Sequence, residues 1–500
     1  MNLFKLFIIC CLLISTTIRG FEYFEDYRFD SFDQSSSGGE SSSSNSYDQD
    51  KCKGKPNPYS IFDKEPVFVA STANGKLYKT GDDHNQVSVL HLYGEAYEMG
   101  YAHGTLLKEQ VNDIIPKFME FAEIAVQEFI KSKFAVRLPE FLIKLIEEFG
   151  VNAALDYVAS ATEQFTPKRF FNELLGLADA SGISYQTLLR MHMFPELVKA
   201  TCSIVGAWNE ATINGGLLQV RALDWGLENP LVNYPTLIVY HPEENDGSEF
   251  SILSWTSFIG ALTGYSQRTG VCEKVWLSYN GTYTHNGMPF YFILRDILQY
   301  DNSIYEALNR IYNTPRTCAV YLGIGSNESN TASLLEVSMD IVRIFDDETP
   351  FPGFAPQVPE HPLFKDLVYV DKHTQPSTDP CMANSLNQSW SEITAQTLIN
   401  TMGQMETGDL HSAIYDFKKN FVYVSVATTN IPFPFTNATL PLVSPAYKNQ
   451  FIQFNMTKLF SEQPPPTPTP TPNSSSSNSS NSSNSSNSSN SSSNSESESN

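Results

Sequence analysis

Three polar side chains near the middle of the chain have the types needed for nucleophilic chemistry. Cys202 lies in the run ATCSIVGAW, and Arg221 and Asp224 lie in a second apolar run, LLQVRALDW. A guanidinium beside a thiol favours the thiolate, which is the nucleophilic form of cysteine. A nearby carboxylate can accept a hydrogen bond from an amine or a thiol. The alternative is a core or disulfide-bonded Cys202, because cysteine is among the most buried residue types, with Arg221 and Asp224 as a surface ion pair.

A β-hairpin would bring these residues together. The turn Asn-Gly-Gly at 214–216 separates the two runs, and its glycines can adopt the positive φ that a hairpin turn needs. Side chains alternate along a strand, so Gln219, Arg221 and Leu223 share one face of the returning strand. We therefore expect Cys202 and Arg221 to lie near each other at the same end of the hairpin.

The surrounding sequence predicts an α+β fold. Residues 96–200 have a mainly helical pattern, with apolar residues at three- and four-residue steps over 109–134. Pro116 should kink or restart that helix. After the helices, short β-branched and aromatic runs are separated by turns, with helical stretches near 289–313 and 391–404. Many strands with interspersed helices indicate sheets packed between helical layers.

The two ends of the chain indicate a secreted protein. Residues 1–20 open with a lysine, continue with an apolar run and end with small and polar residues, which is the pattern of a signal peptide. Residues 21–54 form a low-complexity, Ser/Gly-rich segment, and 461–500 are Pro/Thr-rich and then Ser/Asn-rich, which is too polar to fold alone. Between them we expect an N-terminal helical region at 55–201 and a nucleophile region at 202–460. The predicted location is outside the cell or in the endolysosomal lumen.

Composition argues against several classes of function. A net charge of −23 disfavours a nucleic-acid partner, because phosphate contacts need a basic surface. The nine histidines include no HExxH motif and no close Cys/His cluster, so we expect no metal and no cofactor. Beyond the signal peptide, no apolar run reaches the roughly 20 residues of a membrane-spanning helix, so no transmembrane segment is expected.

Cysteines and glycan sites fit the secretory route. After removal of the signal peptide the chain keeps an odd number of cysteines, namely Cys52, Cys202, Cys272, Cys318 and Cys381. In an oxidising compartment four of them can form two disulfides, and one is left over. We predict that Cys202 is the free thiol and that the other four are paired. Acceptor sites for N-glycans, each followed by x-Ser/Thr, occur at Asn280, Asn327, Asn387, Asn437 and Asn455.

The stretch that starts at Cys202 resembles the start of the catalytic subunit in cysteine N-terminal nucleophile hydrolases. These enzymes include acid ceramidase, N-acylethanolamine acid amidase, bile-salt hydrolase, penicillin V acylase and the penicillin acyltransferases. Their shared pattern is a Cys followed by Arg-x-x-Asp, which here is Cys202 and then Arg221-Ala-Leu-Asp224. LYGEAYEMGYAHGTLL at 92–107 and TGDLHSAIYDFKKNFVYVSVA at 407–427 resemble the acyltransferase branch.

The resemblance implies a fold, a maturation step and a reaction. The fold would be an αββα sandwich with an N-terminal helical segment, and the precursor would cut itself between Thr201 and Cys202. The freed α-amine, with an ordinary pKa of roughly 7.7–8, would act as general base for the Cys202 thiol. The thiolate would form a thioester with an acyl group, Arg221 would stabilise charge, and Asp224 would hold the amine. The expected substrate is a small lipid-like amide or ester.

The oxyanion-binding residues are where this chain departs from the resemblance. Relatives use a backbone N–H together with an Asn side chain. This chain has Ser266 in GALTGYSQRTG, and Asp371 and His373 in VDKHTQ, where such donors are expected. The oxyanion hole is therefore unassigned. Arg316 could add charge to a pocket, but a surface or helix-end role is favoured.

Three other functions stay open from the sequence. One is a phospholipase B-like esterase, which uses nearly the same chemistry on acyl esters. Another is a catalytically silent secreted glycoprotein with the same fold. A papain-like Cys–His enzyme is a weaker reading, because His192 lies only shortly before Cys202 and no CGSCW-like signature occurs.

Overall fold

The computed structural model describes residues 52–81, 85–131, 138–198, 200–351, 361–429 and 443–466. The expected signal peptide, most of the Ser/Gly-rich segment, Asn437 and the Ser/Asn-rich tail lie outside these ranges. None of the helices in the described ranges combines the length and the apolar composition that crossing a membrane requires.

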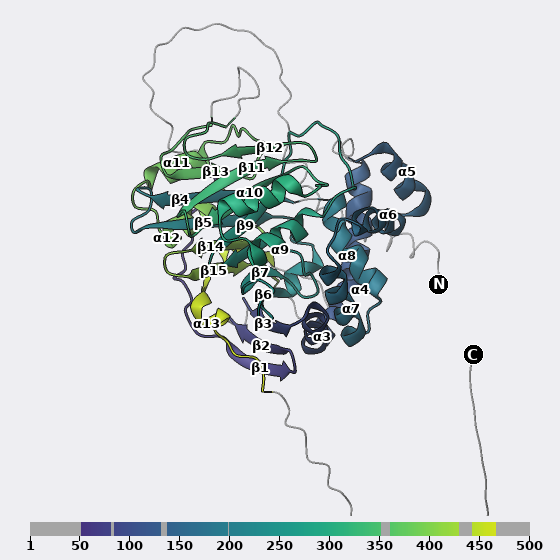
Figure 1. The fold of residues 1–500 in the computed structure, drawn as a ribbon. Coiled ribbons are helices and arrows are strands. Elements are labelled where there is room, and N and C mark those ends of the chain that lie inside the picture. Colours follow the sequence, from purple (N-terminus) through teal and green to yellow (C-terminus); the bar gives the residue numbers. More distant parts are fainter. Residues whose placement is uncertain are drawn as a thin grey trace, which may run out of the picture. The chain divides into compact units, whose positions relative to one another are not determined.

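The strands form two large sheets (Figure 1). The larger sheet has the order β1-β2-β3-β6-β7-β8-β9-β10-β11-β12. Its strands are β1 Val67–Thr72, β2 Gly75–Thr80, β3 Val87–Gly94, β6 Pro235–Pro242, β7 Phe250–Trp255, β8 Thr263–Ser266, β9 Thr269–Val275, β10 Val320–Ser326, β11 Thr331–Val337 and β12 Val342–Phe345. The smaller sheet has the order β13-β4-β5-β14-β15-β18. Its strands are β13 Leu367–Val370, β4 Thr201–Asn209, β5 Gly215–Asp224, β14 His411–Asp416, β15 Phe421–Val426 and β18 Ile452–Asn455. The short strands β16 Thr428–Thr429 and β17 Val443–Ser444 pair with each other.

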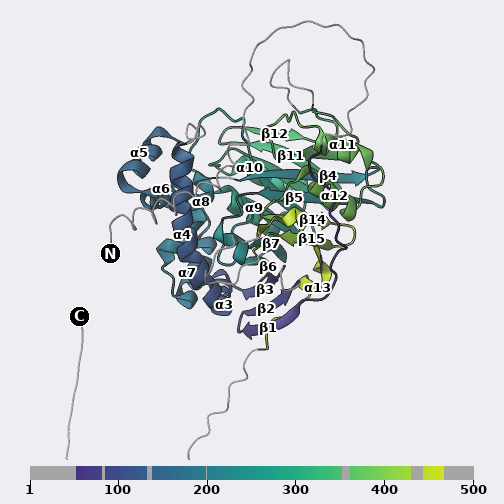
Figure 2. The same cartoon turned by 180° about the vertical axis from the view of Figure 1, so that it is seen from behind.

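Helices flank both sheets. The N-terminal helices are α3 Ala96–Leu106, α4 Lys108–Lys131, α5 Glu140–Phe149, α6 Val151–Glu163, α7 Lys168–Ser181 and α8 Tyr185–Leu197. Later helices are α9 Phe290–Tyr300, α10 Ile304–Asn313, α11 Cys381–Gln388, α12 Ala395–Met405 and the short α13 Met456–Phe460. Helices α4 to α8 gather on one side of the sheets in both views (Figure 1, Figure 2).

Three hydrophobic clusters define four layers. One cluster lies between the sheets and joins residues such as Ile204 of the smaller sheet to Tyr321 of the larger one. A second cluster packs α9 and the N-terminal helices against the larger sheet. The third packs α11 and α12 against the outer face of the smaller sheet. The order is therefore helices, sheet, sheet, helices, and the predicted α+β layering with an N-terminal helical segment is confirmed.

The N-terminal region contains strands as well as helices. The helical pattern over 96–200 agrees with α3 to α8, and α4 buries the expected apolar stripe that includes Ile114, Phe118 and Val126. The helix does not restart at Pro116 but continues through it to Lys131. Ahead of these helices β1, β2 and β3 join the larger sheet, with β3 parallel to β6. The sequence pattern ahead of the helices did not predict these three strands.

The predicted hairpin is formed by β4 and β5. The two strands are antiparallel, and Gly215 begins β5 with a φ of 72°, a backbone conformation that favours glycine. The returning strand pairs on its other edge with β14, so the hairpin lies inside the smaller sheet. This position excludes water from both faces of the strand ends that carry Cys202 and Arg221.

Candidate active site

The hairpin places Cys202 and Arg221 on one face at the same end, as expected. Cys202 pairs directly with Leu223, and Arg221 pairs with Ile204. Because side chains alternate along each strand, these four lie on the same face of the sheet. Diagonal neighbours on such a pair of strands are within reach of a long side chain. Both Cys202 and Arg221 have 0% exposure, and the thiol lies 3.8 Å from the carbonyl oxygen of Ala200, just before Thr201.

Arg221 is held by a carboxylate from the facing sheet. Its Nη2 lies 3.4 Å from Oε2 of Glu273 on β9, and both side chains are buried. Among the described residues, Nε and Nη1 of Arg221 have no hydrogen-bond partner. Burial raises the pKa of the Cys202 thiol well above its ordinary value, the Arg221 charge opposes this, and the Glu273 and Asp224 charges add to it. Burial therefore favours the protonated thiol.

Asp224 lies on the opposite face of the hairpin. It pairs with Thr201 in the strand register, which puts its carboxylate on the same face as the Thr201 side chain and on the other face from the thiol. Thr407 donates a hydrogen bond of 2.6 Å to Oδ2, and the Gly408 amide donates one of 2.7 Å to Oδ1. Ser203 donates in turn to the Thr407 hydroxyl at 2.7 Å. Asp224 is thus fixed in one orientation next to the proposed cleavage point.

Two buried charged residues on β9, Glu273 and Lys274, were not predicted from the sequence. Lys274 has no exposed area, and its Nζ has no hydrogen-bond partner among the described residues. Burial lowers the pKa of Lys274, while the charges of Cys202 and Asp371 raise it. The sequence did contain a signal for these two residues. The adjacent charges Glu-Lys interrupt an apolar strand in CEKVW, whereas a strand with one solvated face would alternate polar and apolar residues.

Asp371, at the position where the resemblance expects an amide donor, is a buried carboxylate. Its Oδ1 accepts hydrogen bonds from the Gln375 side chain at 2.7 Å and the His373 amide at 3.0 Å. Its Oδ2 has no partner among the described residues. Burial pushes the pKa of Asp371 up, but hydrogen bonds and the charge of His373 hold it below its ordinary value. As a carboxylate it accepts hydrogen bonds and donates none.

Two other residues from the sequence analysis have structural partners away from the thiol. Ser266 accepts a hydrogen bond of 2.9 Å from the Thr269 amide within its own turn. Arg316 donates from Nε to the Ser338 carbonyl at 2.8 Å and from Nη1 to the Thr314 carbonyl at 3.1 Å, at the end of α10. This is the helix-end role favoured for Arg316 above.

His192 is unsuited to act as a base for Cys202. Its Nε2 accepts a hydrogen bond of 3.0 Å from the Ile259 amide, so Nδ1 carries the proton and donates to the Leu188 carbonyl at 2.7 Å. Burial lowers the pKa of His192 to about 4. With both ring nitrogens engaged, the papain-like reading loses its support.

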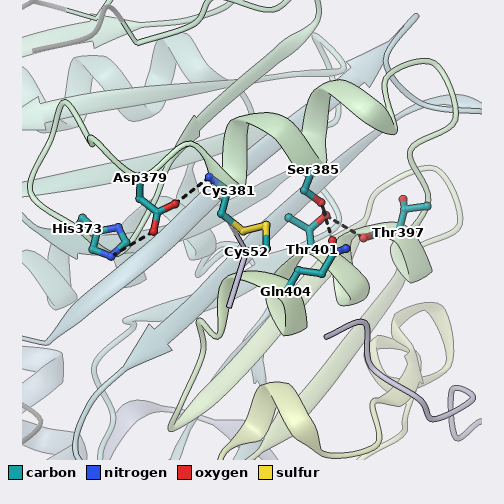
Figure 3. Close-up of a disulfide and its surroundings, with 8 residues drawn as sticks. All are labelled: Cys52, His373, Asp379, Cys381, Ser385, Thr397, Thr401 and Gln404. Carbon is teal, nitrogen blue, oxygen red and sulfur yellow. Dashed lines mark hydrogen bonds and ion pairs between the residues drawn. A yellow bond between two sulfur atoms is a disulfide. The ribbon is translucent and has the colours of Figure 1, made fainter. Parts of the chain in front are cut away.

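The cysteine prediction is partly wrong. Cys52 and Cys381 form a disulfide with an S–S distance of 2.02 Å (Figure 3). Within the described residues Cys202 lies outside any disulfide, as expected. Cys272 and Cys318 do not pair. Cys272 faces the space between the sheets and accepts a hydrogen bond from Gln219, whereas Cys318 packs in the cluster on the other side of the larger sheet. The sheet separates the two thiols, so they cannot form the second predicted disulfide.

The disulfide anchors the start of α11. Asp379 accepts a hydrogen bond of 2.8 Å from the Cys381 amide, and it points toward His373 (Figure 3). One turn further on, Ser385 and Thr401 join α11 to α12 through a hydroxyl contact of 2.7 Å. The segment around Cys52 is thereby bound to the helices that cover the smaller sheet.

Predicted glycan sites differ in accessibility. Asn280, Asn327 and Asn387 are exposed. Asn455 is half-buried, and its Oδ1 accepts a hydrogen bond from the Lys458 amide at the start of α13. Attachment of a glycan to any of these residues stays a prediction. Within the described ranges, no group of three or more His, Cys, Asp or Glu side chains is arranged to hold a metal ion.

Sequence comparison identifies close and distant relatives. Protein dcd1B of Dictyostelium discoideum is 87% identical over 469 residues, which cover 93% of this chain and 94% of that protein. Protein dcd1A of the same organism is 49% identical over 419 residues, or 82% of this chain and 94% of that protein. Acid ceramidase of Rattus norvegicus is 22% identical over 281 residues, or 51% of this chain and 69% of that protein. No protein-family model matches the chain.

Solved structures give only weak likenesses. An ortholog of N-acylethanolamine-hydrolyzing acid amidase from Caenorhabditis elegans has a TM-score of 0.34 at 14% identity, and covers 43% of this chain and 93% of that chain. Penicillin V acylase from Agrobacterium tumefaciens has a TM-score of 0.30 at 10% identity, and covers 45% of this chain and 83% of that chain. These TM-scores are too low to assign a fold, so the layer order rests on strand pairing and packing. The similarity to dcd1B and dcd1A extends over most of each protein, and the chain therefore belongs to the family of the Dictyostelium discoideum dcd1 proteins.

Proposed function

We propose that this chain is an amidohydrolase or acyltransferase that cuts itself between Thr201 and Cys202 and then cleaves N-acyl bonds through a thioester on Cys202. One observation carries the proposal. A buried thiol and a buried guanidinium share one face of a hairpin end, and Glu273 holds the guanidinium from the facing sheet. The distant sequence similarity to acid ceramidases supports an amide as the bond that is cleaved.

Self-cleavage would supply the base that the thiol needs. The Cys202 sulfur adds to the Thr201 carbonyl carbon, the C–N bond breaks, and the Cys202 nitrogen leaves as an α-amine that takes up the thiol proton. Water then hydrolyses the Thr201 thioester, which yields the Thr201 carboxylate and restores the thiol. Asp224, which is paired with Thr201 in the register, is positioned to orient the new amine.

Turnover follows the same sequence on a substrate. The α-amine of Cys202 takes the thiol proton, and the thiolate adds to the carbonyl carbon of the amide. The carbonyl electron pair moves to oxygen and then returns, the C–N bond breaks, and the proton goes to the leaving amine. Water hydrolyses the thioester to a carboxylic acid, or another amine or thiol takes the acyl group. Arg221 stabilises the negative charge that develops near the sulfur.

A lipid-like substrate and a secretory location belong to the same proposal. A ceramide is the fatty-acid amide of a long-chain base, so a ceramidase-like site would take an apolar acyl chain. The 33 Phe and 24 Tyr residues of the chain can line such an acyl pocket. The disulfide between Cys52 and Cys381 suits an oxidising compartment outside the cytosol.

Fatty-acid release from a substrate panel tests the proposal. The panel contains a ceramide, an N-acylethanolamine and a phospholipid ester, assayed at acidic and neutral pH with wild type and Cys202→Ala. We expect release from an amide by wild type and none by Cys202→Ala. Release from the ester alone would assign the phospholipase-like function. No release from any substrate by a correctly cut chain would contradict the proposed enzyme and favour a silent glycoprotein.

A further inference from the structure

Lys274 is a buried cation that the reaction scheme above leaves without a task. Its side chain has no exposed area, and its Nζ has no hydrogen-bond acceptor among the described residues. Its Nζ lies 5.8 Å from the centroid of the Tyr321 ring. Burying an ammonium group without a partner costs free energy. Such groups are common at functional sites, where they stabilise a charge that develops during a reaction.

Packing between the two sheets places Lys274 at the Cys202 end of the hairpin. Cys272 on β9 accepts a hydrogen bond of 3.0 Å from Gln219 on β5, so Cys272 faces the hairpin. Lys274 lies two residues further along β9 and on the same face, just as Arg221 lies two residues further along β5 than Gln219. The contact between Glu273 and Arg221 shows that the two strands stay together over this step. Lys274 therefore points toward the end of β5 that pairs with Cys202.

Negative charges around Lys274 oppose the effect that burial has on its ammonium group. Burial lowers the pKa of Lys274 below its ordinary value, and the charges of Asp371, Asp224 and Glu273 oppose this shift, as would Cys202 once its thiol is ionised. The reverse effect is also present, since the Lys274 charge favours the Cys202 thiolate. A buried amine that has no hydrogen-bond acceptor among the described residues and lies at the Cys202 end of the hairpin is suited, when protonated, to bind an oxyanion.

We propose that Lys274 is a catalytic residue whose ammonium donates a hydrogen bond to the oxyanion formed when Cys202 adds to a carbonyl group, an assignment that rests on the proposed function. As the C–S bond forms, the carbonyl electron pair moves to oxygen, and Lys274 stabilises that charge without giving up its proton. When the pair returns, the C–N bond breaks and the contact weakens. Asp371 cannot supply this donor because it is a carboxylate.

Lys274→Met and Lys274→Arg in the full chain test the assignment on the amide that wild type hydrolyses fastest. Loss of one oxyanion donor lowers kcat about 10²- to 10³-fold. We expect this loss in Lys274→Met with KM changed less than about threefold, because the contact forms mainly in the transition state. Lys274→Arg should recover part of the rate because it keeps a donor and a charge. Lys365→Met, which removes a largely exposed lysine, should leave kcat unchanged.

Self-cleavage also passes through an oxyanion, so Lys274→Met can be slow to mature. A second pair of chains, with and without Lys274→Met, carries the factor Xa sequence Ile-Glu-Gly-Arg at 198–201 and is cut with that protease to expose Cys202. The cut Lys274→Met chain should still show the loss in kcat. A cut Lys274→Met chain as fast as its wild-type counterpart would overturn the Lys274 assignment and leave the proposed function intact. If wild type does not cut itself and the factor Xa-cut wild type is inactive, the Lys274 assignment and the proposed function are both overturned.

Discussion

At the scale of single residues, the site combines one fully satisfied group with others that have spare hydrogen-bonding capacity. Asp224 accepts from Thr407 and Gly408 and is fixed. Arg221 has one carboxylate contact, and its Nε and Nη1 lack partners among the described residues. Leaving buried donors unpaired costs free energy in the resting protein. The cost is repaid when a negative charge develops next to those donors in the transition state.

Substitutions at Arg221 and Asp224 should slow turnover more than one at Arg316. Arg221→Ala removes the guanidinium that shares a face with Cys202, and Asp224→Asn removes the carboxylate paired with Thr201, so we expect each to lower kcat about 10²-fold or more. Arg316→Ala should lower thermal stability instead, because Arg316 holds backbone carbonyls at the end of α10. The measurement is kcat for amide hydrolysis by correctly cut chains, with Tm recorded for each. An equal loss of kcat in Arg316→Ala would argue against the assigned roles.

At the scale of elements, a buried histidine pair lies where the N-terminal strands meet the rest of the larger sheet. His91 on β3 and His241 on β6 lie 3.0 Å apart, from Nδ1 to Nε2. Lys76, Tyr78, Tyr93 and Glu462 are the other titratable groups around them. Burial lowers the pKa of His91 to about 4 and, together with the neighbouring charges of His91 and Lys76, lowers that of His241 to about 3.

Acid should weaken this junction. An unfolded histidine has a pKa near 6.5, so the depressed folded values give stability above about pH 6.5 that is lost as the pH falls toward 4. Between pH 6.5 and 4.5 the loss is on the order of 2 kcal/mol for each histidine. The variant His91→Gln/His241→Gln should therefore lose less Tm than wild type between pH 7 and pH 4.5. Equal losses in thermal-unfolding scans would show that the pair does not carry this pH dependence.

The hairpin was predictable from the sequence, but the strand that packs against it from the other sheet, β9, was not. The glycine turn and the apolar runs around Cys202 specify a hairpin locally, and the alternation of side chains then puts Cys202 and Arg221 on one face. Glu273 and Lys274 enter the site from the other sheet, through packing between layers that no local pattern encodes. The prediction of a second disulfide was wrong for the same reason, because an odd number of cysteines does not say which thiols lie on opposite sides of a sheet.

At the scale of the whole molecule, the proposed cut would not release the N-terminal part. Strands β1 to β3 lie before the cut and are joined to the larger sheet through the β3–β6 pairing. Cys52 also lies before the cut, and its disulfide partner Cys381 lies after it (Figure 3). The two pieces would therefore stay together, both by hydrogen bonds and by a covalent link. Only under reducing and denaturing conditions should they separate.

N-terminal sequencing after gels with and without reductant tests the central claim, that Cys202 becomes a new N-terminus. Wild type should run as one band without reductant and as two bands with it, and the C-terminal piece should begin at Cys202. Cys202→Ala should run as one band in both conditions, because it lacks the attacking sulfur. Cys381→Ser should separate into two bands even without reductant. A wild-type chain that stays single under reduction, with no N-terminus at Cys202, would contradict the account.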